Sequence, residues 1–277
     1  MSRIVCDVCP HLCALEEEQT GFCGARSNQG GKISADSYGR VTAVALDPVE
    51  KKPLRRFFPG SRILSVGSYG CNLRCPGCQN HAISMVRPGE DSGTEYLSPK
   101  VLSDQALELK AAGNIGIAFT YNEPLICPEY VLDCSRLNRE NGLKNVAVTN
   151  GYVNPRTLRR LLPMLDAMNI DLKSFSPEFY RRISGGLDEV KQAISIASEV
   201  CHVEVTTLII PGENDTAEEM DRLSGWLSEV NPEIPLHVTR FFPRYKQADK
   251  SPTPVGTVGS LAEAARRNLK YVYEGNV

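Results

Sequence analysis

The chain of 277 residues carries 31 Lys and Arg against 33 Asp and Glu, a formal net charge of -2 at pH 7. This balance provides no electrostatic footprint for nucleic acid or for an anionic membrane surface. Hydrophobic residues make up 42% and charged residues 23% of the chain, which is ordinary for a globular protein with a substantial core. No apolar run approaches the ~20 residues that cross a bilayer, and the amino terminus lacks the apolar core of a signal peptide. We therefore expect a cytoplasmic protein with no nucleic-acid or membrane partner.

The first cysteine group lies in residues 1–60, a glycine-rich segment without a regular helix or strand pattern. Its four cysteines, Cys6, Cys9, Cys13 and Cys23, follow the spacing C-x2-C-x3-C-x9-C. Because the cytosol keeps thiols reduced, such a set predicts a metal site rather than disulfides. Four thiolates with no open position are typical of structural zinc or of a saturated iron-sulfur cluster. Only the first two form the C-x2-C pair that zinc favours, so zinc and a second 4Fe-4S cluster both stay open.

From residue 61 onward, short β-rich runs alternate with helical patterns, which predicts βα units around a parallel sheet. A closed eight-stranded barrel typically takes ~250 residues, so we predict an α/β fold with a partial (β/α)6 TIM-like barrel over 61–277 and a small Cys-rich extension over 1–60. The predicted strands are 62–66, 115–120, 145–149, 167–172, 202–210 and 236–241. The predicted helices are 99–112, 127–141, 155–162, 176–199 and 216–230, before a tail with a helix at 262–267 and a strand at 271–273.

The second cysteine group follows the first predicted strand directly, as Cys71, Cys75 and Cys78 in the spacing C-x3-C-x2-C. Three thiolates on one short loop suit a 4Fe-4S cluster, which needs soft ligands and can leave its fourth iron open for a substrate or cofactor. A zinc site or a disulfide-rich loop can have the same spacing.

Polar motifs follow the other predicted strands. In parallel βα architectures the reactive groups sit at the carboxyl ends of the strands, where the loops converge. Each motif also has an ordinary structural role: a buried capping Glu, a common Asn-Gly turn, an ion pair, or a satisfied histidine on a strand. The motifs are Tyr121-Asn122-Glu123-Pro124, Thr149-Asn150-Gly151, Asp171-Leu172-Lys173, Ile210-Pro211-Gly212-Glu213-Asn214-Asp215 and His237.

Taken together, the cysteine loop and these motifs resemble the radical S-adenosylmethionine (SAM) enzymes. The wider set resembles the AmmeMemoRadiSam-system radical SAM proteins, relatives of pyruvate formate-lyase activating enzyme, over nearly the whole chain. That set comprises Cys9-Pro10-His11, Gly21-Phe22-Cys23-Gly24, the stretch 47–54, Cys78-Gln79-Asn80 and Lys270-Tyr271-Val272-Tyr273. The resemblance implies that Cys71, Cys75 and Cys78 hold a 4Fe-4S cluster whose open iron chelates SAM.

The resemblance also implies a SAM-binding set, and two positions depart from it. An arginine of the activating enzymes is replaced by Thr206, so Lys173 or a neighbouring loop is expected to supply the charge for the SAM carboxylate. Gly77 stands where most members carry an aromatic residue near the adenine, and Tyr69 or Tyr121 is expected to fill that space. The implied SAM-binding residues are Tyr121, Asn122, Glu123, Thr149, Asn150, Asp171, Lys173, Thr206 and His237.

The leading hypothesis is an enzyme that reductively cleaves SAM to a 5'-deoxyadenosyl radical, which abstracts hydrogen from a substrate carbon. By resemblance to activating enzymes, the substrate is a glycine Cα of a partner protein, with a small molecule or another peptide as alternatives. The resemblance implies a flavodoxin- or ferredoxin-like electron donor. Competing hypotheses are a non-catalytic iron-sulfur electron carrier or metal-binding partner subunit, and a zinc-stabilised interaction module. No catalytic residue is assigned.

Overall fold

The computed structural model describes residues 3–86 and 93–277. Its strands are β1 (Ile4–Val5), β2 (Ala14–Leu15), β3 (Arg26–Gln29), β4 (Lys32–Ala35), β5 (Arg40–Val41), β6 (Ala43–Pro48), β7 (Arg62–Gly67), β8 (Glu95–Tyr96), β9 (Asn114–Phe119), β10 (Lys144–Thr149), β11 (Ala167–Asp171), β12 (His202–Ile209), β13 (Leu236–Arg240) and β14 (Val272–Gly275). Its α-helices are α1 (His81–Ser84), α2 (Pro99–Glu108), α3 (Pro128–Glu140), α4 (Pro155–Leu161), α5 (Pro177–Arg182), α6 (Leu187–Ser198), α7 (Ala217–Val230) and α8 (Val255–Arg266). Short 3-10 helices are η1 (Val49–Lys51), η2 (Leu109–Ala112), η3 (Pro124–Ile126), η4 (Leu162–Met164) and η5 (Tyr245–Gln247).

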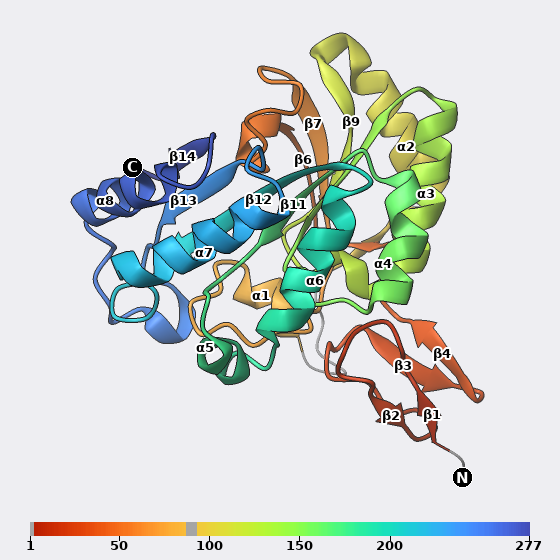
Figure 1. Ribbon diagram of the computed structural model, residues 1–277. Helices are drawn as coiled ribbons and strands as arrows, with labels where there is room; N and C mark the ends of the chain where they lie inside the picture. The colour runs from red at the N-terminus through yellow and green to blue at the C-terminus, as the bar shows by residue number, and fades with distance from the viewer. Residues whose placement is uncertain (1–2, 87–92) are drawn as a thin grey trace.

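The main sheet has eight strands in the order β14-β13-β12-β11-β10-β9-β7-β6. All neighbours pair in parallel except β6, which runs antiparallel to β7 at the edge. In Figure 1, α2, α3 and α4 lie beside one half of this sheet, and α6, α7 and α8 lie beside the other. The predicted α/β partial barrel is therefore confirmed, and the tail strand expected over 271–273 is β14, which joins the sheet as a seventh parallel strand.

The six predicted strands appear within one or two residues of their expected bounds, and so do the helices expected over 127–141, 155–162 and 216–230. The helix expected over 99–112 is α2 followed by η2, and the tail helix expected over 262–267 is α8, which begins earlier, at Val255. The helix expected over 176–199 is two helices, α5 and α6, separated by a short turn. Ser184 in that turn has a left-handed φ of 61°, and Gly185-Gly186 follows it. Two glycines in succession weaken a helix because glycine loses the most backbone freedom on folding.

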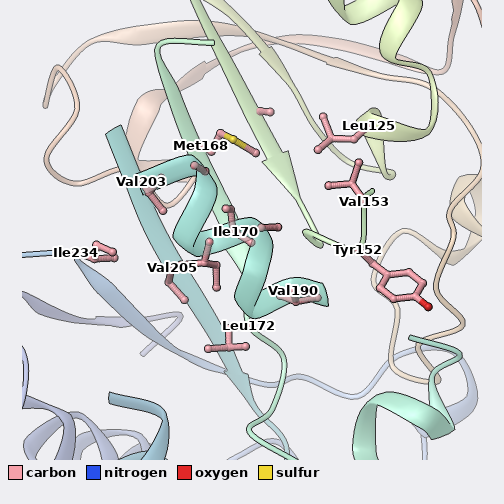
Figure 2. Packing of buried hydrophobic residues seen from close by; sticks show 14 of the residues in the cluster. Leu125, Tyr152, Val153, Met168, Ile170, Leu172, Val190, Val203, Val205 and Ile234 are labelled. Carbon is pink, nitrogen blue, oxygen red and sulfur yellow. The ribbon is translucent and has the colours of Figure 1, made fainter. Parts of the chain in front are cut away.

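Alternation along β11 separates the helix-facing layer of the core from the barrel interior. Met168, Ile170 and Leu172 are fully buried, and Figure 2 shows this apolar layer where α6 crosses the sheet. Successive side chains of a strand point to opposite faces, so the polar residues Asn169 and Asp171 point the other way, into the barrel. Because of this alternation, polar side chains face the barrel interior while the apolar layer stays buried.

The amino-terminal part forms a small module of two hairpins, β1 with β2 and β3 with β4. Figure 1 shows it at one corner of the molecule, below α3 and α4. The buried Arg26 guanidinium fastens it to the barrel through two hydrogen bonds of 2.8 Å to Glu129 and one of 3.0 Å to the Ile126 carbonyl. The division at residue 60 remains a prediction, and the hydrogen bonds between β6 and β7 cross it.

Within residues 3–86 and 93–277, no helix is long and apolar enough to cross a membrane.

Candidate functional site

A cavity of about 590 Å³ opens at the carboxyl ends of the parallel strands. This volume lies within the range of small-molecule and cofactor sites, roughly 300–1,000 Å³. The sequence-predicted residues that line it are Cys71, Cys75, Cys78, Tyr121, Asn122, Glu123, Thr149, Asn150, Asp171 and Lys173. The fold thus gathers side chains from the ends of four strands around one space.

The three cysteines of the loop after β7 are free thiols on the wall of this cavity. The Cys71 sulfur accepts hydrogen bonds from the Leu73 backbone N–H at 3.4 Å and from the Asn150 amide at 3.6 Å. Burial raises the pKa of Cys71 and of Cys75 above the ordinary value of a thiol. The raised pKa values favour the protonated thiols, and a bound metal centre would reverse this preference, because coordination deprotonates a thiol. Three soft donors on one short loop, facing a roomy cavity, fit a 4Fe-4S cluster with one open iron.

The amino-terminal module supports this loop from behind. The Cys71 N–H donates to the Cys23 carbonyl at 3.1 Å, and a ring nitrogen of His11 lies 2.8 Å from the Asn72 carbonyl. Gly70 has a φ of 83°, and a Cβ there would lie 2.6 Å from the Cys23 carbonyl oxygen. Only glycine combines this conformation with so close an approach. The amino-terminal cysteines and the cysteines of the loop after β7 are separated in sequence but are therefore neighbours in space.

Tyr121 occupies a left-handed turn at the end of β9, with a φ of 73°. This conformation is uncommon for a residue with a side chain and costs roughly 1–3 kcal/mol. The Tyr121 hydroxyl donates to Asp47 at 2.9 Å, and the ring packs over Gly67, where a Cβ would come within 2.7 Å of it. The Lys52 ammonium lies 4.6 Å from the ring centroid. These contacts stabilise a strained backbone beside the cavity.

Asn122 mainly supports the backbone of the site through its side-chain hydrogen bonds. Its amide donates to the carbonyls of Tyr69 and Gly70 at 3.0 and 3.1 Å, and its carbonyl accepts from the Ser68 N–H at 3.0 Å. These bonds hold the segment that leads into the cysteine loop.

Glu123 is a buried carboxylate that joins the ends of β9 and β10. One of its oxygens accepts from the Thr149 hydroxyl at 2.7 Å and from the Leu125 N–H at 3.0 Å, and the other accepts from the Asn150 N–H at 2.7 Å. Burial raises the pKa of Glu123 to about 7, although these three donors oppose the rise. Glu123 therefore caps η3, as one reading of the sequence expects, and also lines the cavity.

Asp171 and Lys173 form an ion pair of 2.8 Å at the end of β11. Leu172 between them is fully buried on the opposite face, as the period-two alternation of a strand predicts. Burial alone would lower the pKa of Lys173, but the Asp171 carboxylate raises it above the ordinary value, with Cys75 adding to the effect. The ammonium therefore stays charged beside the cysteine loop.

Two residues of the expected SAM-binding set do not line the cavity. Thr206 lies in the middle of β12 and donates to Asn169 at 3.0 Å, whereas Leu208, two residues further along, does line the cavity. His237 is the second residue of β13, and its ring nitrogen lies 2.6 Å from Glu204. Strand alternation predicts the face of a side chain but not its depth along the barrel, and both side chains lie deeper than the cavity. We leave both out of the proposed SAM-binding set.

The four amino-terminal cysteines share a second, much smaller cavity of about 10 Å³, which His11 and Arg26 also line. All four are free thiols. Burial raises the pKa of Cys9 to about 12 and also raises the pKa of Cys23. In the described part of the chain, no three His, Cys, Asp or Glu side chains are gathered tightly enough to hold a single metal ion. The case for a metal here thus depends on the spacing, the free thiols and the shared cavity.

Sequence reasoning did not single out several other residues of the main cavity. Their spacing carries no motif, and they come from η1 and the residue after it, from the carboxyl end of α5 and from η5. Only the segment 47–54 had drawn attention, through the family resemblance. The cavity residues missed in this way include Lys51, Lys52, Arg182 and Gln247, whereas Glu213 belongs to the motif that follows β12.

Comparison with known proteins agrees with this geometry. An uncharacterized protein of Methanocaldococcus jannaschii, MJ0808, is 38% identical over 280 residues, which span 100% of this chain and 82% of that protein. The pyruvate formate-lyase-activating enzyme of Clostridium pasteurianum is 26% identical over 176 residues, or 62% of this chain and 71% of that enzyme.

Streptococcus suis SuiB bound to S-adenosylmethionine superposes with a TM-score of 0.56 at 13% identity, over 76% of this chain and 48% of SuiB. Identity this low shows a shared fold alone. The model of the radical SAM superfamily matches residues 65–224, which include the cysteine loop and most of the strands around the cavity. The chain belongs to the radical SAM superfamily.

Proposed function

We propose that the protein reductively cleaves SAM at a site-differentiated 4Fe-4S cluster held by Cys71, Cys75 and Cys78, and so generates a radical that abstracts hydrogen from a substrate carbon. The observation that carries this proposal is the single cavity in which the three free thiols meet Glu123 and the Asp171–Lys173 pair. The protein is an enzyme by its family, which implies the cluster and SAM as cofactors. When bound, the cluster supplies the electron that splits SAM into methionine and a 5'-deoxyadenosyl radical.

The protein's own groups match the charged end of SAM, which carries an ammonium and a carboxylate. Glu123, with Thr149 and Asn150 bonded to it, offers acceptor oxygens for the ammonium. Lys173, held by Asp171, offers the positive charge for the carboxylate. An ion pair in a partly buried site keeps this charge in place without reorganisation when a ligand enters.

For the substrate, we propose a glycine Cα of a partner protein, by analogy with the activating enzymes among the relatives. A small molecule or another peptide would use the same cavity, and the proposal is tested by supplying candidate partners. We propose a flavodoxin- or ferredoxin-like protein as the electron donor. A donor of this kind would transfer one electron at a time to the loop cysteines' cluster.

We further propose that Cys6, Cys9, Cys13 and Cys23 hold a second metal centre, either zinc or a 4Fe-4S cluster. Two features support it: the cavity that the four cysteines share, and the shortness of their segment, which has little core in which to pack cysteines without a metal. Because Cys23 and His11 bond to the cysteine loop, loss of this centre is expected to weaken the main site as well as the fold.

The test is anaerobic reconstitution with iron and sulfide, reduction with dithionite, and chromatography for 5'-deoxyadenosine. Cys71→Ala, Cys75→Ala and Cys78→Ala should each abolish its formation. Cys201→Ala is the matched control, because Cys201 is a free, partly buried thiol outside both cavities. About eight irons per chain would assign a second cluster to the amino-terminal cysteines, and about four irons with one zinc would assign zinc.

Persistent SAM cleavage in the triple variant of the loop would show that the cluster assignment is wrong. A bound cluster without cleavage of SAM, even with candidate partners present, would instead favour the electron-carrier alternative.

A further inference from the structure

The residue before the third loop cysteine, Gly77, has no room for a side chain. A Cβ at this position would lie 2.5 Å from the side-chain oxygen of Gln247 and 3.1 Å from the ring of Phe241. Neither Tyr69 nor Tyr121 comes this close, although one of the two was expected to fill the space: Tyr69 packs near Cys23, and Tyr121 packs over Gly67. The space beside Gly77 is therefore taken by residues that follow β13.

The backbone that carries Gln247 is fastened to the cysteine loop. The Lys246 N–H donates to the Pro76 carbonyl at 3.0 Å, and the Gln247 N–H donates to the Arg244 carbonyl at 3.0 Å. Tyr245, in the same 3-10 helix, stacks on the His81 ring with centroids 4.5 Å apart and an angle of 16° between the planes. The backbone that carries Gln247 is thus bonded directly to the cysteine loop.

The side-chain amide of Gln247 has hydrogen-bonding capacity that the protein does not use. The residue is 7% exposed and lines the main cavity. Its oxygen is buried and has no hydrogen-bond partner, and of the described residues with such an orphaned buried atom, only Gln247 lines this cavity. A buried amide without a partner is costly, and in a native structure it calls for an explanation such as an absent ligand.

We propose that Gln247 recognises the adenine base of SAM, an assignment that rests on the proposed function. A carboxamide combines one acceptor and one donor and can rotate to present either. The adenine edge offers the complementary pair, an exocyclic amino donor beside a ring-nitrogen acceptor, and glutamine pairs with this edge in two hydrogen bonds.

The charge distribution of the cavity agrees with this orientation. The ammonium and carboxylate of SAM need charged partners, and those lie at Glu123 and Lys173. The neutral amide of Gln247 matches the neutral base. Gln247 would then recognise the adenine from the space beside Gly77.

The experiment compares binding of SAM with binding of its hypoxanthine counterpart, S-inosylmethionine, to the reconstituted, unreduced protein by anaerobic equilibrium dialysis. Replacing the amino group by oxygen turns the donor into an acceptor. The wild-type protein should prefer SAM by roughly 5- to 150-fold, the discrimination expected of one bidentate amide–base pair. In Gln247→Leu this preference should fall to within about threefold.

The matched control is Gln79→Leu, because Gln79 also lines the cavity but is exposed. It should keep the wild-type preference. Gly77→Ala tests the same contact from the other side, since its methyl group must displace the Gln247 amide. The preference of Gly77→Ala for SAM should fall like that of Gln247→Leu. If Gln247→Leu fails to fold or to retain iron, the result for Gly77→Ala tests the assignment of Gln247 by itself.

A wild-type preference that survives in both variants would overturn the assignment, and so would a wild-type protein that binds the two ligands equally. Failure of the proposed function looks different. In that case the reduced wild-type protein would form no 5'-deoxyadenosine at all, whatever its preference between the two bases.

Discussion

At the end of the barrel away from the cavity, Glu204 should be the residue whose contribution to the free energy of unfolding depends most on pH. It is fully buried in β12, and its two oxygens accept four hydrogen bonds. The backbone N–H groups of Arg55 and Arg56 lie at 3.0 and 2.8 Å, and ring nitrogens of His202 and His237 lie at 2.9 and 2.6 Å. The carboxylate therefore ties the connection that follows β6 to β12 and β13.

The size of the effect follows from the pKa of Glu204. Burial alone would raise it, but the hydrogen bonds from His202, His237 and the two backbone amides lower it from 4.5 to about 2. Each pKa unit corresponds to about 1.4 kcal/mol, so the ionised form contributes about 3 kcal/mol to the free energy of unfolding. Because the folded pKa is depressed, this contribution is complete above pH 4.5 and is lost as the pH falls toward 2.

Glu204→Gln mimics the protonated carboxyl, and it should lower the free energy of unfolding at pH 7 by about 3 kcal/mol. With a urea slope of about 3 kcal/mol per molar for a domain of this size, the unfolding midpoint should fall by about 1 M. The difference between wild type and variant should shrink to about half at pH 3. The assay is urea unfolding followed by circular dichroism between pH 7 and pH 3.

The control is Glu233→Gln, an exposed glutamate paired with Lys270, and its unfolding midpoint should match that of the wild type. Equal stability of Glu204→Gln and wild type at pH 7 would refute the reasoning. A deficit that stays constant down to pH 3 would also refute it, since the carboxylate would then not be the titrating source of the stability.

Three further substitutions test how the amino-terminal module and the Tyr121 turn support the site. Arg26→Lys removes the two-pronged contact with Glu129, since lysine lacks the planar fork. It should lower the free energy of unfolding by about 2 kcal/mol and speed proteolysis of the module; unchanged proteolysis would contradict this. Tyr121→Phe removes the hydroxyl bond to Asp47 and should cost about 1 kcal/mol in urea unfolding, and an unshifted midpoint would argue against that bond. Gly70→Ala adds a methyl group 2.6 Å from a module carbonyl and should reduce iron retention after reconstitution, whereas full retention would show that the module does not support the loop.

Much of the fold was predictable because its signals are local. The apolar alternation around Asp171 and the strand-to-helix rhythm after residue 61 depend on neighbours in sequence, and the strands appear where that pattern predicts them. The cysteine loop is equally local, since a cluster's three ligands can come from one turn. The short strands β1–β5 and β8 escaped prediction because strands of two to four residues carry almost no periodicity.

The sequence by itself determined the parallel order of βα units, the superfamily and the three loop cysteines, because each depends on residues a few positions apart. The tertiary structure alone decided how deep along the barrel a side chain lies. For this reason Thr206 and His237 bond to Asn169 and Glu204 and do not line the cavity. It also decided which distant segments meet. Gly77 and Gln247 are in contact, yet they are far apart along the chain, and no spacing rule connects them. Strand alternation gives a side chain its face, whereas register, barrel curvature and loop packing set its position along the barrel and its partners.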